Sequence, residues 1–352
     1  MITLGVLSFS QPTSYLAKMA EHAAENGVMI CLISPTQLTE GTSSVSGLMY
    51  TSEKKEWKNS IFPIPSFIYD RCYYGTKKAQ LFKAVTDSLK LQENIQFLGY
   101  GLPNKWEVYN KLSSIQEIQA FFPQTKKLTS VTFFLSHFRL KDRWLIKPIN
   151  GSQGRGLIKV ERIEGQYIVK EVVQPGESLY VFRTDKHLKK WLHSRMKVTE
   201  YIFQPFLPLQ NKRDVPFDLR LLLQKNEDGN WTERVRCIRT GPKNHITSNL
   251  AGGGEMLPFS VITQGLKRSK REELERKLQV IVEHLPVAID ETISPLFELG
   301  IDIGIDPDYN LWILDINSKP GHKIVTMASP SVQAEIYEAP SKYCMYLSSI
   351  KR

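Results

Sequence analysis

The amino-acid sequence predicts an α/β N-terminal domain, Rossmann-like in its order of strands and helices, followed by an α+β region of two subdomains. Near the start, short apolar runs alternate with helical periodicity, which is typical of parallel α/β units. From about residue 143 the pattern changes to pairs of strands joined by glycine-rich turns. A chain of 352 residues has room for two or three domains. We therefore expect domains at residues 1–100, 101–203 and 204–352.

The composition, 41% hydrophobic and 23% charged, is that of a soluble globular protein. No apolar run approaches the roughly 18 residues of a membrane span, and the start lacks the features of a secretory signal, so we expect a cytoplasmic protein. The four cysteines are far apart and fit neither a metal motif nor a disulfide framework. We expect them to be reduced packing residues.

The formal net charge of +10 favours anionic partners such as nucleotides. The densest basic stretch, residues 267–271, runs directly into Glu272 and Glu273. This pattern favours the solvated start of a helix over a nucleic-acid-binding arm. Because we expect the charge to be otherwise spread along the chain, nucleic-acid binding is the weaker hypothesis.

The apolar patterns predict the following elements. The expected strands are residues 2–9, 28–34, 67–71, 94–99, 143–149, 157–163, 167–173, 201–207, 217–225 and 231–240 and a hairpin at 301–317, and the expected helices are 13–26, 76–91, 105–121, 185–195 and 270–294. Leu81, Phe82, Val85 and Leu89 would share one face of the helix at 76–91. The first turn lacks GxGxxG, which argues against a nicotinamide site.

Three oxygen-bearing side chains mark the predicted hairpin at 301–317. Asp315 and Asn317 stand two residues apart on one strand and so share a face, and Asp302 can lie across from them. Two carboxylates and an amide oxygen suit Mg²⁺. The alternative is a solvent-facing strand edge with scattered acids.

A lysine and a glycine-rich loop follow each other in the second region. Lys147 ends an apolar strand, and the loop GSQGRG begins four residues later, with Ser152, Gln153, Gly154 and Gly156 as candidate ligand residues. Glycines allow backbone N–H groups to line a phosphate. The sequence has no Gly-Lys-Ser/Thr, so this loop joins two strands and is no Walker P-loop. A flexible hairpin tip is the alternative.

Three arginines lie on neighbouring predicted strands. Arg236 and Arg239 are three residues apart, so at least one of them should reach a cleft, and Arg220 adds another cation. The planar guanidinium suits phosphate oxygens. Asn249 and the glycines at 252–254 form a second backbone-rich loop. The alternative is that these arginines are ordinary surface residues.

The segment YIFQPFL joins two modules and is a candidate adenine slot, since ligand clefts favour domain junctions. It includes Gln204, Pro205, Phe206 and Leu207. The Pro205 carbonyl could accept a hydrogen bond from the adenine amino group while the Leu207 N–H donates one to the ring.

Over residues 100–335, these elements in this order resemble the ATP-grasp superfamily. The family's lysine and glycine loop are similar to Lys147 with GSQGRG, and its D-x-R segment is similar to FDLR. Its SNL-x-x-GG segment is similar to TSNLAGG, and its metal strand is similar to LWILDINSKPG. PSFIYDR, LPNKW and FFPQT resemble the YheC/YheD family, ATP-grasp proteins described as associated with the endospore coat. The fold implied is a pre-ATP-grasp domain followed by a two-subdomain ATP-grasp fold.

The resemblance implies roles for the candidate residues. Lys147 would hold the α- and β-phosphates of ATP, with Lys105 or Lys111 as a second nucleotide lysine, and residues 152–156 would cover the phosphates. Arg220 and Arg239, with Asn249, would act on the transferring phosphoryl group, and the hairpin acids would hold one or two Mg²⁺. The family usually has glutamate where this chain has Asp315, which puts a metal-bridging role, and with it the catalytic rate, in doubt.

The implied activity is a Mg-ATP-dependent ligase that joins a carboxylate to an amine or thiol through an acyl phosphate. No nucleophilic triad is needed, and none is apparent, although His245 and His322 lie near the proposed cleft. The other hypothesis is a spore-coat-associated protein that binds ATP with little or no turnover and has coat proteins as partners.

Overall fold

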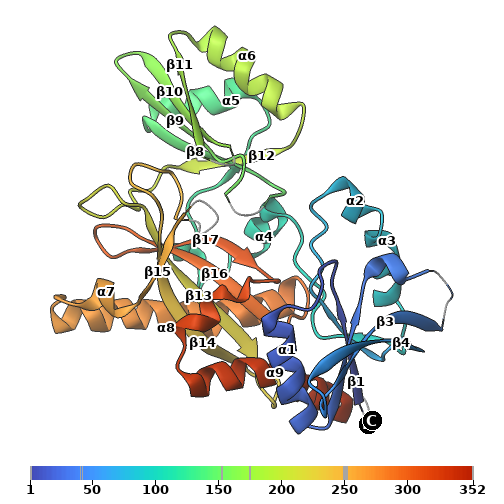
Figure 1. Ribbon diagram of the computed structural model, residues 1–352. Coiled ribbons are helices and arrows are strands. Elements are labelled where there is room, and N and C mark those ends of the chain that lie inside the picture. The colour runs from blue at the N-terminus through green and yellow to red at the C-terminus, as the bar shows by residue number, and fades with distance from the viewer. Residues whose placement is uncertain are drawn as a thin grey trace.

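The computed structural model describes residues 2–39, 41, 43–151, 154–173, 176–248 and 253–350. The described strands form two six-stranded sheets and one five-stranded sheet. Figure 1 shows the first sheet beside the third, and the second sheet above the third.

The first sheet has the order β4-β3-β2-β1-β5-β6. Its parallel part is β1 (Ile2–Leu7), β2 (Val28–Ile33), β5 (Phe67–Asp70) and β6 (Gln96–Phe97), with α1 (Ser14–Glu25) between the first two strands. The hairpin of β3 (Ser44–Thr51) and β4 (Glu56–Pro63) is antiparallel and was not expected. Most of β4 is exposed, so its sequence lacks the apolar run that marked the buried strands.

Two predicted helices are wrong in length. The helix expected at 76–91 is broken into α2 (Lys77–Gln80) and α3 (Lys83–Lys90), and Leu81 between them is 74% exposed, so it does not share the buried face. The helix expected at 105–121 ends early. It consists of α4 (Lys105–Leu112), followed by the 3₁₀ turn η2 (Gln119–Phe121), because the serine pair 113–114 favours a helix end over a helix interior.

The second sheet has the order β11-β10-β9-β8-β12-β7 and is antiparallel throughout. The strands are β7 (Lys126–Lys127), β8 (Arg143–Pro148), β9 (Ile158–Ile163), β10 (Gln166–Val172), β11 (Glu177–Phe182) and β12 (Tyr201–Pro205). The helices α5 (Val131–Ser136) and α6 (Asp185–Met196) pack on one face around Phe134 and Phe203, which are fully buried. The edge strand β11 was not predicted.

The third sheet has the order β15-β14-β13-β16-β17. The strands are β13 (Phe217–Lys225), β14 (Trp231–Thr240), β15 (Glu255–Pro258), β16 (Glu298–Ile305) and β17 (Leu311–Asn317). One face packs on α8 (Arg268–Thr292) and α4 through buried leucines and isoleucines. The described elements also include α7 (Ser260–Thr263) and the 3₁₀ elements η1 (Pro35–Gln37), η3 (His137–Arg139) and η5 (His322–Met327).

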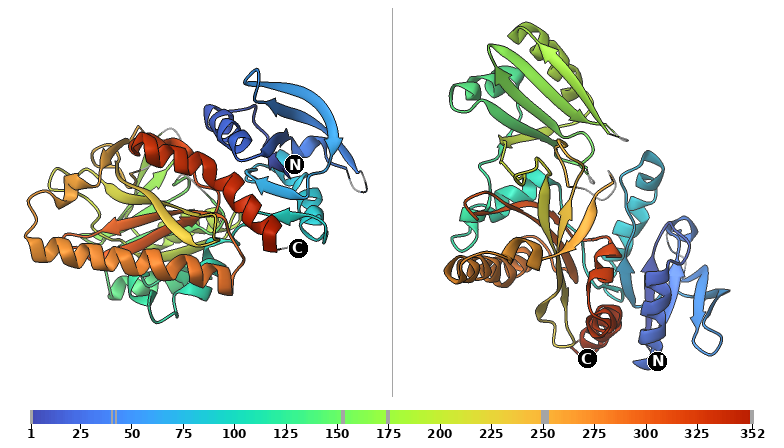
Figure 2. Two further views of the ribbon diagram at one scale, coloured as in Figure 1. Left: turned by 90° about the horizontal axis from the view of Figure 1, so that it is seen from below. Right: turned by 60° about the vertical axis from the view of Figure 1, so that its left-hand side comes forward.

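The helix α9 (Pro330–Ile350) was not predicted, and Pro340 within it interrupts a helical pattern in the sequence. Figure 2 shows α8 and α9 on opposite sides of the third sheet and α9 beside α1. Tyr343 and Cys344 of α9 belong to the buried core of the first sheet. The C-terminal helix therefore joins the first sheet to the third. The predicted domain boundaries stay predictions.

The basic charge is not evenly spread, contrary to expectation. Residues 101–203 contain 18 lysines and arginines against nine acids, so this segment carries +9 of the net charge of +10. Among the described residues, no helix is long and apolar enough to cross a membrane. All four cysteines are buried and free, as expected.

A buried polar network fastens the first sheet to the third. Arg71, which follows β5, pairs with Glu298 of β16 and donates a hydrogen bond of 2.6 Å to the Pro320 carbonyl. The Tyr69 hydroxyl and the His322 ring also contact the Glu298 carboxylate, at 2.6 and 3.1 Å.

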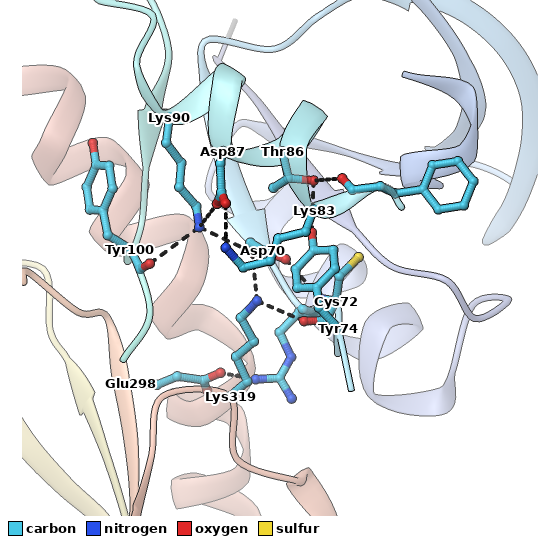
Figure 3. A network of polar contacts seen from close by, with 12 residues as sticks. Asp70, Cys72, Tyr74, Lys83, Thr86, Asp87, Lys90, Tyr100, Glu298 and Lys319 are labelled. Atoms are coloured by element: carbon cyan, nitrogen blue, oxygen red, sulfur yellow. Dashed lines mark hydrogen bonds and ion pairs between the residues drawn. The ribbon is translucent and has the colours of Figure 1, made fainter. Parts of the chain in front are cut away.

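A second pair in the same network lies beside the first (Figure 3). Lys319 donates to the Asp70 carboxylate at 2.6 Å and to the Cys72 carbonyl at 2.8 Å. Burial would raise the pKa of Glu298, but Arg71 and His322 outweigh burial and hold that pKa at about 2. The network is therefore charged at neutral pH and fixes residues 319–322, which follow β17.

We expect Glu298→Gln to lower the free energy of unfolding by about 3–5 kcal/mol, because it leaves the buried Arg71 guanidinium without a counter-ion. The measurement is urea denaturation followed by circular dichroism. Lys83→Met is the matched control, since the Lys83–Asp87 pair is exposed and should contribute less than about 1 kcal/mol. Equal, small shifts in both variants would show that the network adds no net stability.

Candidate active site

A cavity of about 140 Å³ lies between the second and third sheets. Its wall combines strand residues of both sheets with two loops. Of the predicted site residues, those that line it are Lys105, Lys147, Gly154, Gln204, Phe206, Leu207, Arg239, Asp302 and Asp315. Segments distant in sequence therefore converge on one space, as the sequence hypothesis required.

Strand register places the charged residues of the third sheet side by side. Arg220 of β13 pairs with Asp302 of β16, which in turn pairs with Asp315 of β17. On the other flank, Asp218 of β13 pairs with Arg239 of β14. Neighbouring residues of each strand, such as Leu219, belong to the α8 core, so the charged residues occupy the opposite face.

A β-bulge adjusts β17 at the cavity. Asp302 pairs with Asp315 and Ile303 with Ile313, which leaves Leu314 as the extra residue. Ile313 packs in the α8 core, while Leu314 and Asp315 both line the cavity. The bulge thus supplies an apolar side chain and a carboxylate to the site from consecutive residues.

Asp302 is held between two arginines. It pairs with Arg220 and with Arg239, the second at 2.9 Å. Burial would raise the pKa of Asp302, but the two guanidinium groups outweigh burial and hold it at about 2. Asp302 is therefore a carboxylate across the physiological range.

Asp218 completes this ion-pair cluster, although the prediction passed over it. Arg239 donates two hydrogen bonds of 2.7 Å to the Asp218 carboxylate, and the Ser248 hydroxyl donates a third. Burial raises the pKa of Asp218 despite these donors. Its position two residues before Arg220 in FDLR was the available signal, since alternate strand residues share a face.

The predicted metal ligands are present as oxygen donors beside the cavity. Asp315 forms an ion pair with the Lys105 ammonium group. In the strand register, Asp315 lies opposite Asp302 of the adjacent strand β16. Asn317 pairs with Gly300 in the register, and it is not among the residues that line the cavity. Two carboxylates on adjacent strands fit the hard oxygen ligands that Mg²⁺ requires.

Lys147 lies between the two sheets. It is 8% exposed, and its ammonium group donates to the Leu314 carbonyl at 3.3 Å. Burial, and then the positive charge of Lys105, lower the pKa of Lys147 to about 8, against the opposing effect of Asp315 and Asp302. A buried ammonium with one carbonyl partner is well placed to bind an anion.

The glycine loop approaches the same space. Gly154 and Gly156 have φ of +71° and +74°, a conformation that glycine adopts without strain. The Gly156 N–H donates to the Val172 carbonyl at 3.0 Å, which fixes one end of the loop. Gly151, Gly154 and Arg155 line the cavity, whereas the predicted Ser152, Gln153 and Asn249 lie outside the described residues.

The predicted adenine segment forms one side of the cavity. Gln204, Phe206 and Leu207 line it, and Pro205 does not. The Phe206 N–H donates to the Arg143 carbonyl at 3.1 Å, and the Leu207 carbonyl accepts from the Leu209 N–H at 2.9 Å. The apolar lining residues that sequence reasoning missed are Leu145, Leu157, Leu209, Phe217 and Leu314. They offer the flat, apolar lining that a nucleobase needs.

Four other candidates lie outside the cavity. Lys111 donates to the Thr292 carbonyl, which leaves Lys105 as the cavity lysine, and Arg236 pairs with Glu233 and Glu275. His322 stacks on Tyr15 and contacts Glu298 of the buried network. His245 faces Glu177 at 3.8 Å, while its neighbour Ile246 lines the cavity.

Comparison with known proteins agrees with this geometry. A model of the YheC/D-like ATP-grasp family matches residues 94–347. The endospore coat-associated protein YheC of Bacillus subtilis (strain 168) is 32% identical over 352 residues, which covers 99% of this chain and 97% of that protein. YheD of the same strain is 24% identical over 327 residues, 90% of this chain and 70% of that protein.

Solved structures share the fold at low sequence identity. The D-alanine-D-alanine ligase from Coxiella burnetii has a TM-score of 0.51 at 10% identity, over 100% of this chain and 98% of that one. The RiPP-associated ATP-grasp ligase of Chryseobacterium gregarium, solved with ADP and a leader and core peptide, has a TM-score of 0.52 at 12% identity, with the same coverage. The fold is thus that of the ATP-grasp class. Within it, the chain belongs to the YheC/D-like ATP-grasp family, so the family resemblance predicted from sequence is confirmed.

We expect Lys147→Met to abolish most of the thermal stabilisation that Mg-ATP gives, because the buried ammonium is lost from the cavity. The measurement is the shift of the melting temperature with Mg-ATP. Lys111→Met is the matched control, since Lys111 lies on the same short helix as Lys105 but outside the cavity. If both variants kept the wild-type shift, the nucleotide would bind elsewhere.

The lowered pKa of Lys147 predicts a pH dependence of nucleotide binding. As the pH rises from 7 to 9, through a pKa of about 8, the ammonium form becomes the minor one, and Mg-ATP affinity should fall about tenfold. Between pH 8 and the ordinary value of 10.5 the unfolded chain binds more protons, so the stability of the nucleotide-free protein should rise.

Isothermal titration at several pH values measures this effect. Lys147→Arg keeps its charge over the whole range and should bind without the tenfold decline. An equal decline in Lys147→Arg would assign the titration to another group.

Proposed function

We propose that this protein is a Mg-ATP-dependent ligase that joins a carboxylate to an amine or, less favoured, a thiol through an acyl phosphate. The observation that carries the proposal is the convergence of Lys105, Lys147, Arg239, Asp302 and Asp315 on one cavity. Cations for phosphates and carboxylates for a metal thus line the same space. Family membership and the shared fold support the assignment.

The proposed reaction has two steps. An oxygen of the substrate carboxylate attacks the γ-phosphorus of ATP, the bond to the β-phosphate oxygen breaks, and ADP leaves. The amine then attacks the acyl carbon, phosphate leaves and the amine loses a proton. Lys147 and Lys105 would hold the α- and β-phosphates, and the glycine loop, with Ser152 and Gln153, would cover them.

The arginines of the third sheet would stabilise charge on the transferring phosphoryl group. Arg239 lines the cavity, and Arg220 lies behind it, bound to the same carboxylate, Asp302. Asn249 would contribute from the neighbouring loop. Fixed guanidinium groups stabilise developing charge without reorganising, which is the main source of catalysis in phosphoryl transfer.

Asp302, Asp315 and Asn317 are the residues that would hold one or two Mg²⁺. The bound ion would offset negative charge on the phosphates of ATP. The adenine would lie against the apolar end of the cavity, beside Gln204, Phe206 and Leu207, with the Pro205 carbonyl as the proposed acceptor.

A second function draws on the relatives. Both curated relatives are described as endospore coat-associated proteins. A coat-assembly protein that binds ATP with little turnover, and has coat proteins as partners, would keep the fold and the cavity. The aspartate at position 315, shorter than glutamate, favours this function because it limits reach towards a second metal.

We expect ADP release from Mg-ATP that depends on one added carboxylate and one added acceptor. The assay supplies pooled amino acids, peptides and dicarboxylates and then divides the active pool. Asp302→Asn should lower the rate by about 10²–10³-fold. It removes one of the two carboxylates proposed to bind the metal, and it removes the counter-ion shared by Arg220 and Arg239.

Asp308→Asn is the control, because Asp308 is exposed in the turn between β16 and β17 and should leave the rate unchanged. Tight Mg-ATP binding with no ADP from any pool would contradict the ligase and favour the coat-assembly function.

A further inference from the structure

A cluster of side chains that could hold a metal ion lies where α1 meets α9, and none of its members lines the cavity. His22 and Glu25 stand three residues apart on α1, so they share one helix face. Glu338 comes from α9. One ligand atom from each residue can be chosen so that all three atoms lie within 4.8 Å of one another. The sequence could not show this cluster, because 313 residues separate Glu25 from Glu338.

The two distances from the His22 ring nitrogen match the spacing of ligand atoms around a tetrahedral ion. His22 Nδ1 lies 3.4 Å from Glu25 Oε2 and 3.5 Å from Glu338 Oε1. Ligand atoms bound to zinc at about 2.0–2.1 Å in a tetrahedron are about 3.3–3.4 Å apart. Two of the three distances between the ligand atoms therefore already suit one ion, and the carboxylate oxygens lie close enough to share it.

The Nδ1 atom of His22 also lacks a hydrogen bond in the described part of the chain. His22 Nδ1 is buried and has no hydrogen-bond partner among the described residues, although two carboxylates lie next to it. A buried nitrogen without a partner costs free energy, and a metal ion between it and the carboxylates would remove that cost.

Neighbouring contacts hold the ligands in place. Lys342 pairs with the other oxygen of Glu338, Oε2, at 2.9 Å, which leaves Oε1 directed at His22. One turn further along, Asn26 donates to the Ser341 hydroxyl at 3.3 Å and fastens the same two helices. Such outer contacts orient metal ligands in known sites.

We propose that His22, Glu25 and Glu338 form a structural site for a borderline divalent cation such as Zn²⁺, which links the N-terminal sheet to the C-terminal helix. One nitrogen and two carboxylate oxygens suit zinc better than magnesium, which prefers oxygen alone. Glu25 is 72% exposed, so water can complete the coordination and the ion can enter from solvent. This site is independent of the proposed ligase chemistry.

The site would stabilise the joint between two parts of the chain. The helix α9 contributes Tyr343 and Cys344 to the core of the first sheet, next to the cluster in sequence. An ion bound by both helices would therefore resist separation of the first sheet from the third.

The test is metal binding by the full-length protein without nucleotide, measured by isothermal titration with Zn²⁺ and by the visible absorption of Co²⁺. The wild type should bind one ion with a tetrahedral Co²⁺ spectrum and melt at a higher temperature with Zn²⁺. His22→Gln and Glu338→Gln should each weaken binding by about a hundredfold or more, since loss of an outer contact alone costs 10–100-fold.

His193→Gln is the matched control, because His193 is exposed on α6 and has no carboxylate partner among the described ion pairs. It should bind Zn²⁺ like the wild type. Circular dichroism checks that each variant is folded. Wild-type affinity and spectrum in His22→Gln and Glu338→Gln, or an octahedral Co²⁺ spectrum in the wild type, would overturn the proposal.

Discussion

Charge compensation on one face of the third sheet is the constraint on which the site depends. Asp218, Asp302 and Asp315 lie on this face, and each forms an ion pair with a cation. Strand register supplies Arg239 and Arg220, and the start of α4 supplies Lys105, each at hydrogen-bonding distance. Removing one member leaves a buried charge, so the members depend on one another. The arrangement that the proposed chemistry uses is thus also one that stabilises the fold.

The side chains on this face keep their positions only if the residues after β17 stay in place. Contacts with the first sheet hold those residues. Arg71 and Lys319 fasten residues 319–320 to the first sheet. Gly300 allows the Arg220 side chain and Pro320 to pack against the strand, since a Cβ there would lie 2.3 Å from the guanidinium and 2.7 Å from Pro320. The first sheet therefore helps to hold the residues of the site in position.

Sequence patterns predicted what depends on local order. Alternation along one strand indicated Asp315, and a lysine before a glycine loop indicated Lys147. The pairing of Asp218 with Arg239 depends on register between two strands, and the bulge that brings Leu314 to the cavity depends on how β17 pairs with β16. The helix α9 was missed because Pro340 interrupts its pattern, and burial against α1 outweighs that cost. Non-local packing decided each of these cases.

The ion pairs also suit the proposed binding of both a metal and a triphosphate on one surface. Lys105 neutralises Asp315, and two arginines neutralise Asp302. In the proposed reaction, Mg-ATP would offer each group a new partner of the right sign, the metal for the carboxylates and phosphate oxygens for the cations. Such an exchange conserves the number of charge contacts, so little free energy is spent on desolvation. Affinity would then depend on whether Asp315, the shorter acid, can leave Lys105 and still reach the metal.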